Sequence, residues 1–397
     1  MSAALNEWFP LQSESGPVSP YHDRMLRMEV RSLREWDQTA AIWSELANTS
    51  PTCSFFLDRD WVESWLETFG QDLRPSILLF EYDSQPVGIC LLVRTWVVRG
   101  FIPLRRYSLN TSGESQEDTC YAEYNDVLCR PGFEQLISRR LAAYLKDLPW
   151  DELVLPAFSV TDFYEHLKGS MTRLDLEEIL HPSYYVSLSD LREKGLSFQA
   201  ALGSKQRKHL RQNLRNYSEQ GPLELELAED VASAQRLLSE LADLSQKRWT
   251  EMGRKAMFAS ARFRAFNQKL VERCVPKGVV HLMRVSAGGN TIGIVCNLVH
   301  RDRVYFYQCG YNYGSDTRLS PGTVTLSLVI EHYLKTGLDQ FDFLSGDAPY
   351  KRWLSTDYRS LSWSTFRRSG LRMAAFQGMR RMRSGVLKSL NARRSAE

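Results

Sequence analysis

The chain has 397 residues and a formal net charge of +3 at pH 7, with 43% hydrophobic and 24% charged residues. This composition is typical of a globular protein of two or three domains. A net charge this small gives no electrostatic basis for nucleic-acid binding, and no nucleic-acid partner is therefore expected.

Cysteine usage and apolar runs indicate the compartment. The seven cysteines are scattered, and neither they nor the seven histidines have metal-ligand spacing, so no metal site is expected. Several cysteines lie in apolar runs, as in VGICLLV, which is typical of buried thiols in a reducing compartment. The N-terminus does not have the pattern of a secretory signal, and no run approaches the ~18 apolar residues of a membrane span. We therefore expect a cytoplasmic protein.

The first half begins with an irregular tail over residues 1–25 and continues as alternating helices and strands. Asp58 is the expected N-cap of a helix over 59–69, and Gly70 is its expected stop. The remaining elements are a strand over 27–33, a helix over 35–48, a hairpin over 76–94, a strand from Phe101, a helix near 133–146 and a strand over 151–158.

The same order of elements returns about two hundred residues later. A second hairpin spans 279–299, and its Gly293 stands where Gly88 stands in the first. A strand over 303–311, a helix over 323–337 and a strand over 341–345 follow. This repeat predicts an α/β protein with a mixed sheet in each of two tandem units. The expected units are 26–190 and 191–370, followed by a tail over 371–397; we call them the first and second units.

Basic residues gather in two parts of the sequence. The second unit opens with a predicted basic helix over 204–215, followed by a strand and by helices over 230–252 and 260–274. After the repeated elements come a short charged helix over 347–355 and a strand over 359–368. The tail predicts a basic amphipathic helix over 371–394. Each basic residue near anionic lipid contributes up to about 1 kcal/mol, so a peripheral membrane contact is one expected role.

Two segments of the second unit carry candidate chemistry. In YNYGSDTRLSPGTVT, a helix begins at about Thr323 after Pro321 and Gly322, and Arg318 precedes it. A helix N-terminus presents free N–H groups and can bind phosphate, although an ordinary helix start has the same sequence pattern. In FDFLSGDAPYKRW, Gly346 permits positive φ or close approach to a ligand.

The charged residues after Gly346 leave two interpretations open. Asp347 is either a helix cap or a catalytic group, and the spacing places Tyr350 and Lys351 on its face of the helix. Further tyrosines alternate along the strand over 303–311, and Tyr307 is the candidate to line an acceptor cleft. Arg248 and Trp249 lie near a helix end, where a C-terminal cation is also common.

These motifs resemble the GNAT (Gcn5-related N-acetyltransferase) superfamily, in its FemAB-type and CelD-like tandem-domain branch. The resemblance lies in the pattern SKxRxxxRxxxR from Ser204, LSQKRWTEMGR from Leu244, RLSPGTV from Arg318, and DFLSGDAPYKRW. It covers most of 195–368 and implies transfer of an acyl group from a thioester, usually acetyl-CoA. It places the donor pyrophosphate at Arg318, Leu319, Ser320, Gly322 and Thr323. It places the acceptor at Arg248, Trp249, Tyr307, Gln308 and Gly346, with Asp347, Tyr350 and Lys351 catalytic.

The donor loop departs from the family pattern Q/R-x-x-G-x-G/A. Arg318 fits the first position, but Pro321 and Thr323 stand at the two glycine positions. The donor is therefore open among acetyl-CoA, a longer acyl-CoA, an acyl carrier protein and aminoacyl-tRNA. The first unit has no comparable loop.

The expected function is acyl transfer, most simply of acetyl from acetyl-CoA, to an amine or hydroxyl of a sugar, exopolysaccharide or lipid precursor. One alternative is a long-chain N-acyltransferase that makes an amide lipid from acyl-CoA or acyl carrier protein. Another is a non-catalytic accessory protein of polysaccharide biosynthesis.

Overall fold

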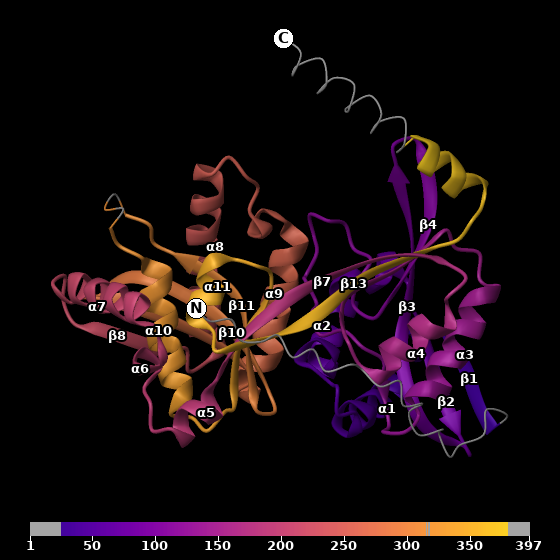
Figure 1. Ribbon diagram of the computed structural model, residues 1–397, viewed down its shortest axis with the longest axis horizontal. Helices are drawn as coiled ribbons and strands as arrows, with labels where there is room; N and C mark the ends of the chain where they lie inside the picture. Colours follow the sequence, from indigo (N-terminus) through magenta and orange to yellow (C-terminus); the bar gives the residue numbers. More distant parts are fainter. Residues whose placement is uncertain (1–24, 315, 317, 380–397) are drawn as a thin grey trace, which may run out of the picture.

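The computed structural model describes residues 25–314, 316 and 318–379. Within this part of the chain, 13 strands form one sheet that runs through two α/β units (Figure 1). Its order is β1-β2-β3-β4-β6-β13-β7-β12-β11-β10-β9-β8, and β5 pairs with β3. The predicted fold class, a mixed α/β sheet in two tandem units, is confirmed.

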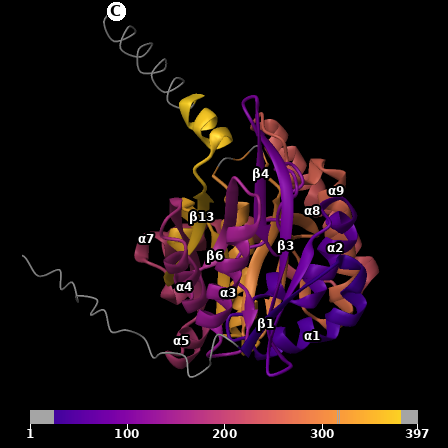
Figure 2. The same cartoon turned by 90° about the vertical axis from the view of Figure 1, so that its right-hand side faces the viewer.

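Helices cover both faces of the sheet in the first unit (Figure 2). Side chains of β2 alternate between them: Leu79 packs with α1 and α2, and Leu78 packs with α3 and α4. Asp58 caps α2 as predicted, since its carboxylate accepts from the Asp60 N–H at 2.9 Å. Gly70 does not end this helix, which continues to Leu73. The elements are β1 (Leu26–Arg31), α1 (Trp36–Thr49), α2 (Arg59–Leu73), β2 (Ser76–Tyr82), β3 (Gln85–Arg99), β4 (Ile102–Leu109), β5 (Leu128–Cys129), α3 (Glu134–Asp147), β6 (Glu152–Ser159) and α4 (Asp162–Ser170).

The second unit repeats this order, with extra helices at its start. α10 packs against β10, as α3 packs on the first sheet. The elements are α5 (Leu188–Glu193), α6 (Phe198–Ala201), α7 (Ser204–Ser218), β8 (Leu223–Leu227), α8 (Val231–Glu251), α9 (Ala261–Cys274), β9 (Val280–Ala287), β10 (Asn290–His300), β11 (Arg303–Tyr311), α10 (Pro321–Leu334), β12 (Gln340–Ser345) and α11 (Pro349–Leu354).

Two long strands are exchanged between the units. β7 (Asp175–Ser187) and β13 (Asp357–Arg367) pair antiparallel along β13 and cross between the units in Figure 1. β13, from the end of the second unit, also pairs with β6, whereas β7, from the end of the first, pairs with β12. Each unit's sheet therefore needs a strand from the other.

An opening forms in each unit where two parallel strands separate. β4 and β6 pair only from Arg106 to Ser108, and β11 and β12 pair only from Arg303 to Tyr305. Beyond these residues the paired strands run on without bonding each other. A pocket lies at each of these separations.

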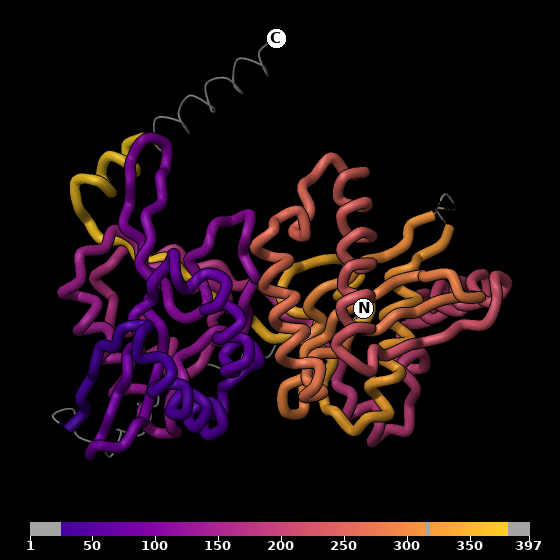
Figure 3. The backbone as a smooth tube through the Cα atoms, turned by 180° about the vertical axis from the view of Figure 1, so that it is seen from behind, coloured from indigo at the N-terminus to yellow at the C-terminus, as the bar shows by residue number. Residues whose placement is uncertain are grey.

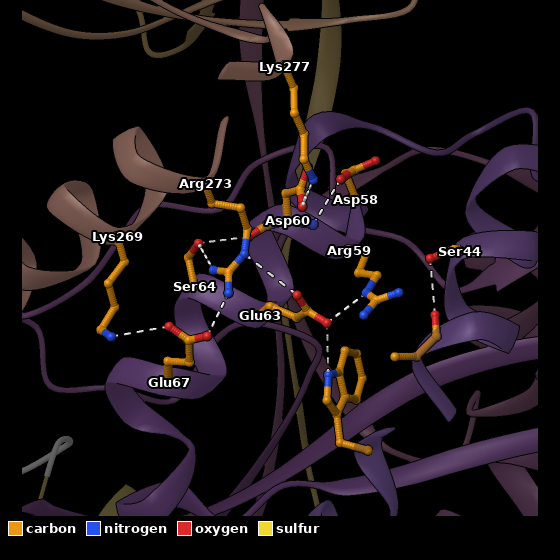
Figure 4. Close-up of polar contacts among 12 residues, drawn as sticks. Ser44, Asp58, Arg59, Asp60, Glu63, Ser64, Glu67, Lys269, Arg273 and Lys277 are labelled. Atoms are coloured by element: carbon orange, nitrogen blue, oxygen red, sulfur yellow. Dashed lines mark hydrogen bonds and ion pairs between the residues drawn. The ribbon is translucent and has the colours of Figure 1, made fainter. Parts of the chain in front are cut away.

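The units share a hydrophobic core in which α2 faces α9. Trp61 packs edge-on against Phe266, with ring centroids 4.8 Å apart. Ion pairs surround this contact: Glu67 bonds Lys269 at 3.1 Å and Arg273 at 2.5 Å, and Lys277 bonds Asp60 (Figure 4). Figure 3 shows the two units side by side in this arrangement.

Gly88 and Gly293 occupy equivalent positions, each under a helix. A Cβ on Gly88 would lie 2.5 Å from Ile137 Cδ1, the flexible end of a side chain on α3. A Cβ on Gly293 would lie 2.5 Å from Thr325 Oγ1 and 2.7 Å from the Tyr311 ring. The repeated glycines therefore allow close helix–sheet packing.

Alanine at either glycine is expected to destabilise the protein by about 1–3 kcal/mol, because overpacking forces side chains to move. Gly293→Ala should cost more than Gly88→Ala, since a ring and a buried threonine yield less than a terminal methyl group. Urea unfolding of both variants measures this, and a larger loss in Gly88→Ala would contradict the packing argument.

The predicted tail helix is partly described. Residues 371–379 are helical, and Met379 lies beside Gly100 at the β3–β4 turn. The rest of this predicted helix, 380–394, and the N-terminal tail over 1–24 lie outside the described residues. In the described part of the chain, no helix is both long enough and apolar enough to cross a membrane.

Candidate functional site

The second-unit pocket, of about 460 Å³, lies where β11 separates from β12. Its wall combines the loop before α10, the end of α8 and the start of α11. It brings together seven of the predicted site residues: Arg248, Trp249, Leu319, Ser320, Gly322, Thr323 and Tyr350. The Arg248 guanidinium stacks over the Tyr313 ring at 4.2 Å. This pocket is thus cationic and aromatic on the α8 side.

A smaller pocket of about 310 Å³ adjoins it and shares Thr323, Tyr350 and Leu354. Lys205 and His209 of α7 line this smaller pocket, close to the N-terminus of α10. The basic helix predicted over 204–215 therefore supplies cationic and polar groups where the resemblance places a donor's phosphates.

Fewer backbone N–H groups are free in the predicted donor loop than a phosphate cradle needs. The Ser320 N–H donates to Asn213 Oδ1 at 2.7 Å, and the Thr323 N–H donates to the Ser320 carbonyl. Pro321 has no N–H, and Leu319 donates to the Asp316 carbonyl. Gly322 keeps an N–H without a partner among the described residues.

Arg318 does not line this pocket. Its side chain is 83% exposed and forms an ion pair with Asp316 at 2.7 Å. The structure thus separates Arg318 from the other predicted donor residues, because the loop directs it into solvent.

The predicted common face of Asp347, Tyr350 and Lys351 is wrong. α11 begins at Pro349 with Ala348 as its N-cap, so Asp347 lies outside the helix and does not cap it. Asp347 pairs with Arg352 and accepts from the Tyr184 hydroxyl at 3.0 Å. The bond from Arg352 lowers the pKa of this exposed carboxyl, which therefore stays ionised. Tyr350 enters the second-unit pocket instead.

Lys351 turns back toward the end of β12. Its Nζ donates to the Leu344 carbonyl at 3.1 Å and to the Ser345 carbonyl at 2.5 Å. Burial lowers the pKa of Lys351, while Glu123 and Asp342 oppose that shift. Gly346 has φ +112, and a Cβ there would lie 3.6 Å from Nζ. The glycine therefore leaves the side of the ammonium group open.

The first-unit pocket, of about 510 Å³, lies at the separation of β4 from β6. Ser345 and Gly346 of the second unit line it, together with Glu123. The Ser345 N–H and hydroxyl both donate to the Glu123 carboxylate at 2.7 Å. Burial raises the pKa of Glu123 to about 7. This carboxyl was not predicted, because it lies in a loop without any motif and more than two hundred residues before Ser345.

Asp342 holds the turn that places Ser345. Its buried carboxylate accepts from Ser183 at 3.0 Å, from the Leu344 N–H at 2.8 Å, and from the Tyr124 hydroxyl. Leu344 takes a positive φ of 61°, which turns the chain out of β12. A network across three chain segments thus stabilises the backbone that contacts Lys351 and Glu123.

Contrary to the prediction, Tyr307 does not line an acceptor cleft. It is buried between the units, where its hydroxyl donates to the Cys120 carbonyl at 2.9 Å and its ring packs against Trp61. The position of Tyr307 was predicted only from the alternation of side chains along the strand, and the strand face on which it lies is covered by α2. Gln308 is half-buried and lies opposite Cys296 of β10.

Comparisons with known proteins agree with this architecture. Residues 204–352 match the family model described as Acetyltransferase (GNAT) domain. No curated protein matches the sequence. FemX is similar in structure, with TM-score 0.54 and 9% identity over 82% of this chain and 95% of that chain.

A second similar structure is the C-terminal domain (DUF2156) of a putative lysylphosphatidylglycerol synthetase from Agrobacterium fabrum. Its TM-score is 0.51, with 11% identity over 88% of this chain and 96% of that chain. At such identities the likeness shows the fold alone. The chain therefore has the GNAT/FemAB-type tandem fold that the sequence predicted.

Proposed function

We propose, from this GNAT/FemAB-type fold and the two pockets, that the chain is an acyltransferase with its active site between its units. The donor thioester enters the second-unit pocket, and the amine or hydroxyl acceptor enters the first-unit pocket. Acyl transfer is the activity to which the GNAT domain match points.

One observation carries this proposal. Ser345 contacts both candidate catalytic groups, since its carbonyl accepts from Lys351 and its N–H donates to Glu123. Ser345 also lines the first-unit pocket, while Tyr350, next to Lys351, lines the second-unit pocket. A half-buried cation and a titratable carboxyl therefore bond the same residue, where acceptor and donor would approach each other.

The chemistry assigns a role to each group. The acceptor loses a proton as its nitrogen or oxygen bonds to the acyl carbon, and Glu123, with a pKa of about 7, is suited to take that proton at neutral pH. The Lys351 ammonium stabilises the negative charge that develops on the carbonyl oxygen and then on the departing thiolate.

The donor is proposed to be an acyl-CoA, most simply acetyl-CoA. Lys205, His209 and the free Gly322 N–H are the groups that would hold its phosphates. The small number of free amides in the loop favours a contribution from α7 in place of the usual backbone cradle. The proposed acceptor is a sugar, exopolysaccharide or lipid precursor.

A long-chain acyl donor is the second candidate. The smaller pocket beside Thr323 is lined by Leu202, Trp353 and Leu354, an apolar wall that suits an alkyl chain. Turnover with acetyl-CoA, palmitoyl-CoA and an acyl carrier protein separates the two candidates by chain length. If the chain is a non-catalytic accessory protein, none of these thioesters should be hydrolysed or used for transfer.

Thr323→Trp tests the donor site directly, because Thr323 lines both donor pockets. The variant is expected to abolish the rise in melting temperature that an acyl-CoA produces in the wild type. Thr336→Trp, at an exposed position in the turn that follows α10, is the control and should keep that rise. An unchanged shift in Thr323→Trp would place the donor elsewhere, and the unliganded melting temperature reports whether each variant folds.

A further inference from the structure

A third pocket, of about 530 Å³, lies between the units; we call it the interdomain pocket. It is bounded by the residues after α1, the end of β6, the β10–β11 turn and β13. Its wall contains Arg303 from the second unit and Arg359 from the exchanged strand β13. The proposed acyl transfer uses neither arginine.

Both guanidinium groups are short of partners. Among the described residues, Arg303 donates only a long 3.4 Å bond to the Tyr305 hydroxyl and lies over the Tyr124 and Tyr305 rings, and its Nε is buried without a partner. Arg359 donates to the Gln340 side-chain oxygen at 2.5 Å and stacks over Tyr185 at 4.3 Å. Within the described residues, neither forms an ion pair.

The equivalent position of the first unit has the carboxylate partner that Arg303 lacks. Arg106 stands opposite Glu152 at the start of the parallel β4–β6 pairing, as Arg303 stands opposite Gln340 in β11–β12. Arg106 bonds the Glu152 carboxylate at 2.7 Å, but glutamine at 340 offers no charge. The arginine is therefore present in both units, whereas the carboxylate is present only in the first.

No carboxylate among the described residues bonds either guanidinium. The Asp342 carboxylate is already bonded by Tyr124, Ser183 and the Leu344 N–H. Asp302 lines the pocket but is exposed, and Arg301 adds a third cation. The remaining polar lining is mostly hydroxyl-bearing: Thr52, Ser54, Ser159, Thr161 and Ser360.

We propose that the interdomain pocket is a binding site for a phosphate group, held by Arg303 and Arg359. A half-buried guanidinium without a carboxylate partner is costly, and an oxyanion supplies both the charge and the acceptor atoms. Because Arg359 comes from the exchanged strand and Arg303 from the start of β11, bound phosphate would also join elements of both units.

Calorimetric titration of the full chain with inorganic phosphate, without donor or acceptor, tests this site. Arg303→Gln and Arg359→Gln are each expected to weaken phosphate binding about tenfold or more, because each loses a charged hydrogen-bond donor. Arg284→Gln is the matched control, since Arg284 of β9 pairs with Glu226 of β8 outside the interdomain pocket, and this variant should bind phosphate like the wild type. Absence of saturable binding to the wild type overturns the proposal.

Gln340→Glu gives a second, opposite test. It restores the carboxylate of the first unit, so it should abolish phosphate binding while raising the urea midpoint of unfolding. Phosphate binding that survives in Gln340→Glu would contradict the assignment to these arginines, even if the arginine variants fold poorly.

Glycerol phosphate distinguishes the source of the phosphate. Tighter binding of the ester than of inorganic phosphate supports a phosphorylated molecule that uses the hydroxyl-lined wall, and equal binding supports the free anion. Neither result depends on whether the chain transfers acyl groups.

Discussion

Lys351→Ala is expected to lower the rate of acyl transfer by about 10²- to 10⁴-fold, the range typical of a lost catalytic acid, base or charge. The Lys351 side chain is half-buried, and its ammonium donates to two carbonyls at the end of β12. Alanine removes the positive charge beside both pockets. The rate constant kcat at saturating thioester and acceptor measures the effect.

Three comparisons make the Lys351 result specific. Lys335→Ala, at an exposed position after α10, is the control and should retain wild-type kcat. The acyl-CoA-induced rise in melting temperature should persist in Lys351→Ala, because the donor pocket is lined by other residues. If Lys351→Ala keeps wild-type kcat, Lys351 has no part in the chemistry.

The elements of both units follow from local sequence. Hairpins, their glycines and the helices after them were predicted because alternation, turn residues and apolar periodicity act within a few residues. Thr323, Gly322, Arg248 and Tyr350 were named from the sequence through motifs that a family resemblance connects. The resemblance assigned Gly322 and Thr323 to the donor but Arg248 to the acceptor, whereas all four line one pocket. The predicted hairpins, glycines and helices are features that neighbouring residues determine.

The remaining features depend on long-range packing. The exchange of β7 and β13 has no local signal, because a strand's pattern does not identify its partner. Glu123 meets Ser345 only as a result of the fold, and its loop shows no motif. The short helix predicted over 347–355 is present but begins two residues later, because Pro349 takes the first helical position; Asp347 lies outside it and pairs with Arg352.

Glu123→Gln is expected to lower kcat/KM by about 10²- to 10⁴-fold at pH 8 and to remove its pH dependence near neutrality. In the wild type, burial raises the pKa of Glu123 to about 7, so the base is protonated and inactive below that pH. Wild-type kcat/KM should therefore fall about tenfold for each pH unit below 7. Glutamine cannot titrate, so the variant's profile should be flat there.

Stability provides an independent readout of the same group. Since the folded-state pKa of Glu123 lies above its ordinary value of 4.5, the folded protein binds more protons than the unfolded chain between these values. This contribution is fully present below pH 4.5 and is lost as the pH rises through 7. The stability of Glu123→Gln relative to wild type should thus increase from pH 5 to pH 8, by up to about 3 kcal/mol. The other titrating groups cancel in this difference, so a relative stability that is constant with pH would show that Glu123 titrates normally and is not the proposed base.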